Sequence, residues 1–338
     1  MQDEQLIRLK QQSQEEPLSR RDFMRALTVA ASAGPGLVAV GLSGFALTRS
    51  QRAEAHEAIV GGLGKLPKVQ FGTKMGKMMI TQISMCQDWN KDLIAPALDM
   101  GVNFIHKAGY WRNNVPDEIK KLPRESYYTD ITVDNTSPNH DPNNFDEAYN
   151  QVVSSLEKNG LKYYDIFRAH YGWETLSSFN KGANASYRAF EKLKKEGKVR
   201  YFGVSQHPYV KYPEIIMEQI ESGKIDAMQV WFSYGKPTED QEIFAKASKA
   251  GVAMTAMKVF AHGSGKMRND PEKMKALKAD GMVGRSLIRY VLNLKRPDGK
   301  PIFHTCVSAL HNQAIFEENI GGASEKVALL DGFDPYTV

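Results

Sequence analysis

Ionisable side chains follow a short apolar run in the stretch Gly101–Tyr110. The apolar residues Val102–Ile105 are followed at once by His106, and Tyr110 comes four residues later. Imidazole and phenol groups can donate or accept a proton during a reaction. In a parallel β/α barrel, the active site is built from residues at the C-terminal ends of buried strands. The stretch therefore predicts acid–base chemistry at one end of such a barrel.

Strand and helix patterns alternate from about Val69 onward. The predicted strands are Ile80–Cys86, Val102–Ile105, Ser126–Val133, Tyr164–Ala169, Val199–Ser205, Ala227–Phe232, Val252–Lys258 and Phe303–Ser308. The predicted helices are Asp92–Asp99, Asp117–Leu122, Asp146–Lys158, Ala185–Glu196, Tyr212–Ser222, Thr238–Ala250, Gly284–Leu294 and Gln313–Ile320. This alternation predicts an α/β fold, a (β/α)8 TIM barrel of about 250 residues, which we assign to residues 56–338. An open, doubly wound sheet is the alternative, but the sequence has no strand–GxGxxG–helix unit.

A β-hairpin is predicted just before the barrel. Phe71–Met78 places turn residues between two short apolar runs, which is the pattern of two antiparallel strands joined by a loop.

The first 55 residues carry a different pattern. The paired arginines of Ser19–Arg25 precede an uncharged stretch from Ala26 to Thr48. This arrangement resembles a twin-arginine export signal, and Ala53–Ala55 offers a small-x-small cleavage site. At about 1.5 Å per residue the stretch 26–48 is also long enough to span a bilayer as an uncleaved anchor. We predict that residues 1–55 form a signal or a membrane anchor, and that the protein is periplasmic, either soluble or membrane-attached.

Composition excludes several classes of protein. The chain has 338 residues, of which 42% are hydrophobic and 25% charged, so it can bury a full-sized core. A net charge of +5 without a long block of like charges predicts no nucleic-acid partner. The two cysteines, Cys86 and Cys306, exclude a disulfide framework or a cysteine metal cluster but leave room for a single bridge.

Several segments resemble the aldo/keto reductases, in the order in which that family has them. Besides the hairpin, the matching segments are Gly101–Tyr110, Tyr164–His170, Gly197–Ser205, Met257–Phe260 and Phe316–Asn319. The resemblance covers roughly residues 69–322, and Gly197–Ser205 is its most specific part. The chain looks most similar to the exported branch with twin-arginine signals. The family reduces carbonyl groups with a hydride from a nicotinamide, so the resemblance implies NADP or NAD and a small-molecule carbonyl substrate.

The family transfers the proton with an Asp, a Tyr, a Lys and a His. The resemblance places the proton-donating Tyr at Tyr110 and the carbonyl-orienting His at His170. His106 stands at the position of the Asp, and Thr132 or Val133 at the position of the Lys. Losing both partners of an ion pair leaves no orphan charge, but the tyrosine also loses the cation that would lower its pKa. A protonated His106 would replace part of that cation's effect.

The cofactor positions of the family are matched unevenly. The resemblance places nicotinamide-binding polar groups at Ser205, Gln206 and Gln229, while Met257 stands where the family usually has a stacking aromatic ring. The run Ser308–Gln313 matches the phosphate loop but lacks its Gly. The remaining candidate cofactor contacts are Lys258, Ala309 and, against the adenine, Asn319.

Histidines gather after the predicted strands. Those at or just after C-terminal strand ends are His106, His140, His170, His207, His262 and His311. With Cys86 or Asp134 they could bind zinc, iron or copper. No two of them have the short spacing of a dedicated metal motif, so a polar rim is the alternative.

Two functions stay open at this point. The first is a reductase that uses Tyr110, His170 and His106. The second is a non-catalytic barrel that acts as a structural or interaction subunit, with residues 26–48 as a tether to a membrane or a membrane complex. We expect the substrate to be selected by two loop insertions, Thr136–Asn144 and Tyr171–Ala183.

Overall fold

A computed structural model describes residues 65–85, 93–106, 115–134, 144–171, 176–206, 212–232, 238–259, 283–308 and 313–323. The predictions for residues 1–55 lie outside these ranges. Among the described residues, no helix is both long enough and apolar enough to cross a membrane.

Eight parallel strands close into a barrel, as predicted. Their order around the barrel is β10, β3, β4, β5, β6, β7, β8, β9, and β9 pairs with β10 to close the ring. The strands are β3 (Ile83–Met85), β4 (Phe104–Ile105), β5 (Tyr128–Asp134), β6 (Tyr164–Tyr171), β7 (Val199–Gln206), β8 (Ala227–Trp231), β9 (Ala253–Met257) and β10 (Thr305–Ser308). The prediction of a TIM barrel is therefore confirmed.

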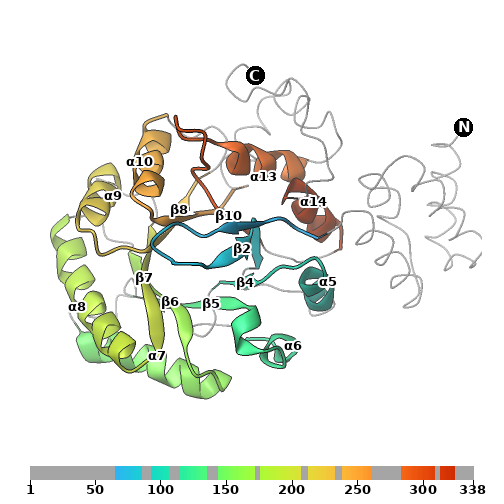
Figure 1. Ribbon diagram of the computed structural model, residues 1–338. Helices are drawn as coiled ribbons and strands as arrows, with labels where there is room; N and C mark the ends of the chain where they lie inside the picture. The colour runs from blue at the N-terminus through green and yellow to red at the C-terminus, as the bar shows by residue number, and fades with distance from the viewer. Residues whose placement is uncertain are drawn as a thin grey trace, which may run out of the picture.

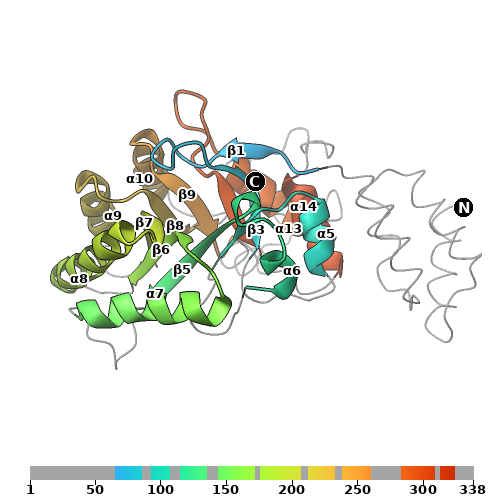
Figure 2. The same cartoon turned by 60° about the horizontal axis from the view of Figure 1, so that its bottom comes forward.

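Helices surround the barrel (Figures 1 and 2). They are α5 (Ile94–Asp99), α6 (Asp117–Lys120), α7 (Phe145–Asn159), α8 (Leu176–Lys195), α9 (Tyr212–Glu221), α10 (Thr238–Lys249), α13 (Val283–Asn293) and α14 (Gln313–Ala323), with a 3-10 turn η2 (Arg124–Ser126) before β5. Helix α7 shows why the sequence folds this way. The side chain of Asn144 caps its first turn by accepting the N–H of Glu147, and Gly160 ends it in the left-handed conformation.

Two predicted boundaries are wrong. The run Ile80–Cys86 is not one strand, because β2 (Met79–Thr81) belongs to the hairpin and β3 begins the barrel at Ile83. Ile80, Ile83 and Met85 are all apolar and buried, so the hydrophobic pattern of the sequence does not mark the break between the two strands. Most of the predicted loop Tyr171–Ala183 is helical, because α8 begins at Leu176. The first turns of α8 contain Ser and Asn, which have low helix propensity, so the sequence does not predict a helix there.

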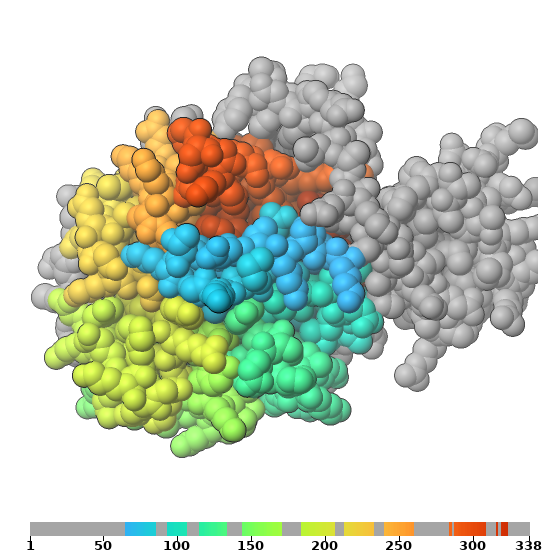
Figure 3. Space-filling model, viewed as in Figure 1, coloured from blue at the N-terminus to red at the C-terminus, as the bar shows by residue number. Residues whose placement is uncertain are grey.

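The hairpin of β1 (Lys68–Gln70) and β2 covers the N-terminal end of the barrel, as the blue segment in Figure 3 shows. Phe71 and Ile80 pack with Phe104, Ile166 and further residues from inside the barrel. The fit is close, because a Cβ on Gly72, whose φ is +62°, would lie 2.7 Å from the backbone of the β9 segment. The barrel is thus closed at this end, and a site can form only at the other.

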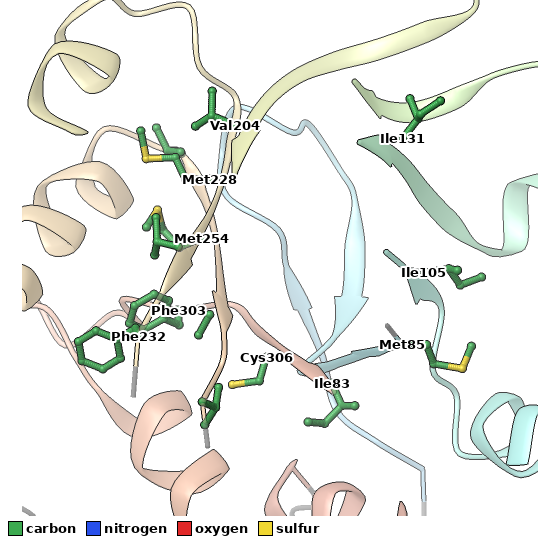
Figure 4. Close-up of a cluster of buried hydrophobic side chains, with 14 of the residues drawn as sticks. Ile83, Met85, Ile105, Ile131, Val204, Met228, Phe232, Met254, Phe303 and Cys306 are labelled. Atoms are coloured by element: carbon green, nitrogen blue, oxygen red, sulfur yellow. The ribbon is translucent and has the colours of Figure 1, made fainter. Parts of the chain in front are cut away.

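The main core lies between the strands and the helices. The outward-facing strand residues in Figure 4 include Ile83, Ile105, Ile131, Met228 and Met254, and all are buried. Cys306 lies in the same layer as a free thiol, and complete burial raises its pKa. Alternation along the strands therefore sends the other residues, several of them polar, into the barrel interior.

Candidate active site

Three predicted site residues lie side by side on neighbouring strands. His170 on β6 is the register partner of Ser205 on β7, and Ser205 is the partner of Gln229 on β8. All three stand near the C-terminal ends of their strands. Ser205 and Gln229 are almost fully buried. The parallel register therefore brings a hydroxyl, an amide and an imidazole residue into one row at the open end of the barrel.

His106 lies in the barrel interior and is completely buried. Its Nδ1 is 2.9 Å from Asp130 Oδ2, and its Nε2 is 2.7 Å from Ser84 Oγ. The ring of Phe104 packs against the imidazole with centroids 4.2 Å apart. His106 is therefore held on both nitrogens by side chains from two other strands, β3 and β5.

Arg168 joins this arrangement from β6. Its guanidinium forms an ion pair with Asp130 Oδ2, lies 3.0 Å from His106 Nδ1, and donates to Gln229 Oε1 on β8. Arg168 is 1% exposed and Asp130 is fully buried. The interior thus holds a charged cluster of His106, Asp130 and Arg168, which we call the interior triad.

Sequence reasoning missed Asp130 and Arg168. Each sits inside an apolar strand run, and such a run with a buried ionisable residue is itself a signal of function or of a paired charge. The signal was available in Tyr164–Ala169, where Arg168 stands among five other residues, most of them apolar.

Thr132 and Val133, the two positions expected for the family lysine, are both buried, and the Thr132 hydroxyl has no hydrogen-bond partner within the described part of the chain. Thr132 is the register partner of Arg168. Asp130 lies two residues earlier on the same face of β5. Asp130 and Arg168 supply a buried carboxylate and a buried cation on the neighbouring strands β5 and β6.

The remaining cofactor candidates differ in their surroundings. Lys258 follows β9 with an exposed side chain whose Nζ is 5.0 Å from the ring of Trp231. Asn319 is buried and donates to Ser308 Oγ at 2.6 Å, so its amide holds α14 against the end of β10. Gln206 is fully buried at the end of β7. These positions leave Lys258 as the exposed cation among the described candidates.

Some predicted residues fall outside the described ranges. Tyr110 and Ala309 are among them, as are His140, His207, His262, His311 and Cys86. Within the ranges that the structure describes, no group of three or more His, Cys, Asp or Glu residues is arranged to hold a metal ion.

Comparisons with known proteins agree with this architecture. A model of the Aldo/keto reductase family matches residues 69–298. The chain belongs to the aldo/keto reductase family. It is 25% identical over 165 residues to YqkF, an uncharacterized oxidoreductase of Bacillus subtilis, a match that spans 45% of this chain and 50% of that protein.

Solved aldo/keto reductases share the fold. A putative aldo-keto reductase from Pseudomonas aeruginosa has a TM-score of 0.60 at 15% identity, covering 79% of this chain and 98% of that one. An aldo/keto reductase from Brucella melitensis has a TM-score of 0.56 at 20% identity, covering 75% and 92%. An aldo-keto reductase from Bacillus halodurans, in its holo form, has a TM-score of 0.55 at 16% identity and covers 79% and 99%. At these identities the likeness concerns the fold.

Proposed function

We propose that this aldo/keto reductase family member reduces a small-molecule carbonyl with NADPH or NADH at the open end of the barrel. A bound nicotinamide would supply the hydride to the carbonyl carbon. The hydroxyl of Tyr110 would give a proton to the carbonyl oxygen, and His170 would orient that oxygen. The carbonyl, one hydride and one proton would thus give an alcohol, and the oxidised nucleotide would leave.

The observation that carries this proposal is the row His170, Ser205 and Gln229. A nicotinamide carboxamide offers one oxygen acceptor and one amide donor, and the side chains of Ser205 and Gln229 can pair with both. His170 stands next to them on β6, within reach of a reactant placed at the same level. Membership of the aldo/keto reductase family supports a role for this row in a reductase site.

Titration of the full chain with NADPH and NADH tests the proposal. We expect quenching of tryptophan fluorescence and a higher thermal midpoint with one of them, since a ligand that binds only the folded state stabilises it. Turnover of simple aldehydes should fall at least about a hundredfold in Tyr110→Phe, because the proton donor is lost. Absence of both nucleotide effects at millimolar concentration would contradict the proposal.

Thr132 favours a second candidate, a barrel retained for interaction rather than catalysis. A threonine cannot supply the cation that the family places beside the catalytic tyrosine. Under this alternative the chain would bind no nucleotide, and its partner would be a membrane or a membrane complex reached through residues 26–48. Robust aldehyde turnover that is lost in Tyr110→Phe would rule it out.

Export is part of the proposal. The paired arginines at positions 20 and 21 support transport by the twin-arginine route to the periplasm. Replacing both with lysine should keep the chain in the cytoplasmic fraction of the cell. Recovery of the variant in the periplasm would show that the pair is not an export signal.

A further inference from the structure

The interior triad connects Gln229, which the proposed function uses to bind the nicotinamide, with His106, which the sequence predicts to support the proton donor. Arg168 contacts His106 on one side and Gln229 on the other, and Asp130 pairs with both His106 and Arg168. These residues come from strands β5, β6 and β8 and the end of β4. Gly203 stands on β7 between Arg168 and β8 in the sheet register, and a side chain there would come within 2.9 Å of Ile166 Cγ2. The absence of a side chain at Gly203 leaves room for Ile166 on the neighbouring strand.

Stability alone is a poor reason for this cluster. The side chains of Asp130 and Arg168 are 0% and 2% exposed, so both charges have lost their hydration. Apolar residues of similar volume in place of a buried ion pair are often neutral or stabilising. A TIM barrel interior is usually filled with branched apolar side chains. A charged cluster at this depth therefore points to a task other than packing.

With a hydrogen on Nδ1, the contacts of His106 to Asp130 and Ser84 are kept in either of two protonation states of the imidazole, although Nδ1 then cannot accept a hydrogen bond from Arg168. The groups within hydrogen-bond reach are Ser84 from β3, Asp130 from β5 and Arg168 from β6. In the neutral state Nδ1–H donates to Asp130 and Nε2 accepts the hydroxyl of Ser84. In the charged state Nε2–H donates to Ser84 Oγ, whose hydrogen turns to the carbonyl oxygen of Cys306, 3.1 Å away. Asp130 favours the charged state and Arg168 opposes it.

Gln229 is held in one orientation. Its Oε1 accepts from Arg168, and a flipped amide would direct its NH2 group at the guanidinium. The Nε2 group therefore remains the donor, and its contact on the described side is Met257 Sδ at 3.5 Å, a weak acceptor. A carboxamide oxygen would be a stronger acceptor for that N–H than the thioether sulfur.

We propose that Asp130 and Arg168 are positioning residues of the reductase site. Arg168 presents the amide N–H of Gln229 to the carboxamide of a nicotinamide, and the Asp130–Arg168 pair sets the protonation of His106 below the proton-transfer site. This inference rests on the proposed function. One buried ion pair thereby positions the Gln229 amide against the nicotinamide and sets the protonation of His106.

The first experiment compares two probes of the full chain. One is whichever of NADPH or NADH binds the unaltered protein, and the other is the matching ADP-ribose compound without nicotinamide. Arg168→Met should weaken binding of the dinucleotide about tenfold, the effect of one misplaced hydrogen bond, and leave the ADP-ribose compound within about twofold. Gln229→Leu should do the same, and the double variant should be no worse than either single one. Equal losses for both probes, or additive losses in the double variant, would overturn the role of Arg168.

The second experiment measures the pH dependence of single-turnover reduction. Asp130→Asn should shift the midpoint of that profile by about one pH unit or more, since His106 loses its charged partner. Asp165→Asn is the matched control, because Asp165 is equally buried and lies on the neighbouring strand, but its ion pairs are with Arg124 and Arg200. The control should leave the midpoint in place, and a shift of the same size in both variants would contradict the inference.

Arg168→Lys keeps the test decisive if Arg168→Met does not fold. A single ammonium keeps a charge near Asp130 but cannot form the planar fork that reaches Gln229 as well. We expect the dinucleotide defect to persist while the pH profile stays near that of the unaltered chain. Binding at full strength in Arg168→Lys would overturn the positioning of Gln229. If the unaltered chain binds neither nucleotide, the proposed function fails; if it binds and reacts but the variants behave as unaltered, only this inference fails.

Discussion

Two fully buried aspartates, Asp130 and Asp165, pair with different arginines on neighbouring strands of the barrel. Asp165 is near the N-terminal end of β6, and Asp130 lies inside the barrel on β5. The partners of Asp165 reach solvent, since the side chains of Arg124 and Arg200 are 14% and 47% exposed. The partner of Asp130, Arg168, is 2% exposed. The two clusters therefore face different costs of desolvation.

The hydrogen bonds of the two clusters also differ in kind. Asp165 accepts the backbone N–H of Thr129 at 2.9 Å, and Arg124 donates to two backbone carbonyls, so this cluster joins the starts of β5 and β6. Both of its arginines also lie over the ring of Tyr163, at 3.9 and 4.0 Å. The interior triad instead contacts side chains, those of Ser84 and Gln229. One cluster fixes the backbone, and the other fixes groups that can act on a ligand.

Removing one arginine from each cluster should give the largest contrast. Arg168→Met leaves Asp130 buried beside His106, and we expect the free energy of unfolding to fall by about 3–5 kcal/mol. Arg200→Met leaves Asp165 paired with Arg124, and its half-exposed pair should cost less than about 1 kcal/mol. Urea denaturation followed by circular dichroism measures both. Equal losses would show that burial does not separate the two clusters.

A double substitution sharpens the same contrast. Asp130→Leu combined with Arg168→Met removes both charges, so the double variant should regain about 1–3 kcal/mol relative to Arg168→Met alone. Its affinity for the dinucleotide should stay low. Asp165→Leu with Arg124→Met should show no such recovery, because the N–H of Thr129 then loses its acceptor. Recovery of affinity along with stability would place the triad among the purely structural clusters.

His304 extends the comparison to a buried imidazole near the N-terminal end of the barrel. Its Nδ1 accepts the backbone N–H of Met254 at 3.0 Å, and burial lowers its pKa to about 4 from an ordinary 6.5. The unfolded chain then binds more protons than the folded one between these values. Stability present above pH 6.5 is lost as the pH falls toward 4, by about 3 kcal/mol at most.

His304→Asn should remove much of that pH dependence, because the amide oxygen can accept the same N–H without titrating. Urea denaturation of both proteins at pH 7 and pH 4.5 gives the difference. An identical pH dependence in His304→Asn would assign the acid sensitivity to other groups.

Periodicity predicted the barrel well because its strands are buried on both faces. Runs such as Val199–Ser205 and Ala227–Phe232 are apolar on the helix side and bounded by turn residues, so local sequence alone identifies them. The two wrong boundaries have a common cause. At Ile80–Cys86 and at the start of α8, tertiary packing decides where an element begins. The hydrophobic pattern of the sequence does not show these boundaries.

The site was harder to predict than the fold. The row of His170, Ser205 and Gln229 follows from strand register, and the resemblance places those residues correctly on neighbouring strands. Asp130 and Arg168 lie outside the expected tetrad positions. A residue-by-residue comparison with the family therefore does not point to either of them. Only the closed barrel brings Arg168, His106 and Gln229 together, because they are 61 and 62 residues apart in sequence.

Lys258 allows a final and smaller test at the open end of the barrel. Among the described residues it alone has a positive φ without being glycine, at +55°, a conformation that costs an L-residue roughly 1 kcal/mol. Lys258→Gly should therefore change the free energy of unfolding by less than about 1 kcal/mol, in the stabilising direction, while removing an exposed cation beside Trp231. If Lys258 contacts the cofactor phosphates, dinucleotide affinity should fall and Lys258→Arg should restore it. Unlike Arg168→Met, Lys258→Gly should weaken binding of the ADP-ribose compound and of the dinucleotide alike. The lost charge would act on the phosphates that both ligands share. A defect confined to the dinucleotide would instead place Lys258 with the triad on the nicotinamide side.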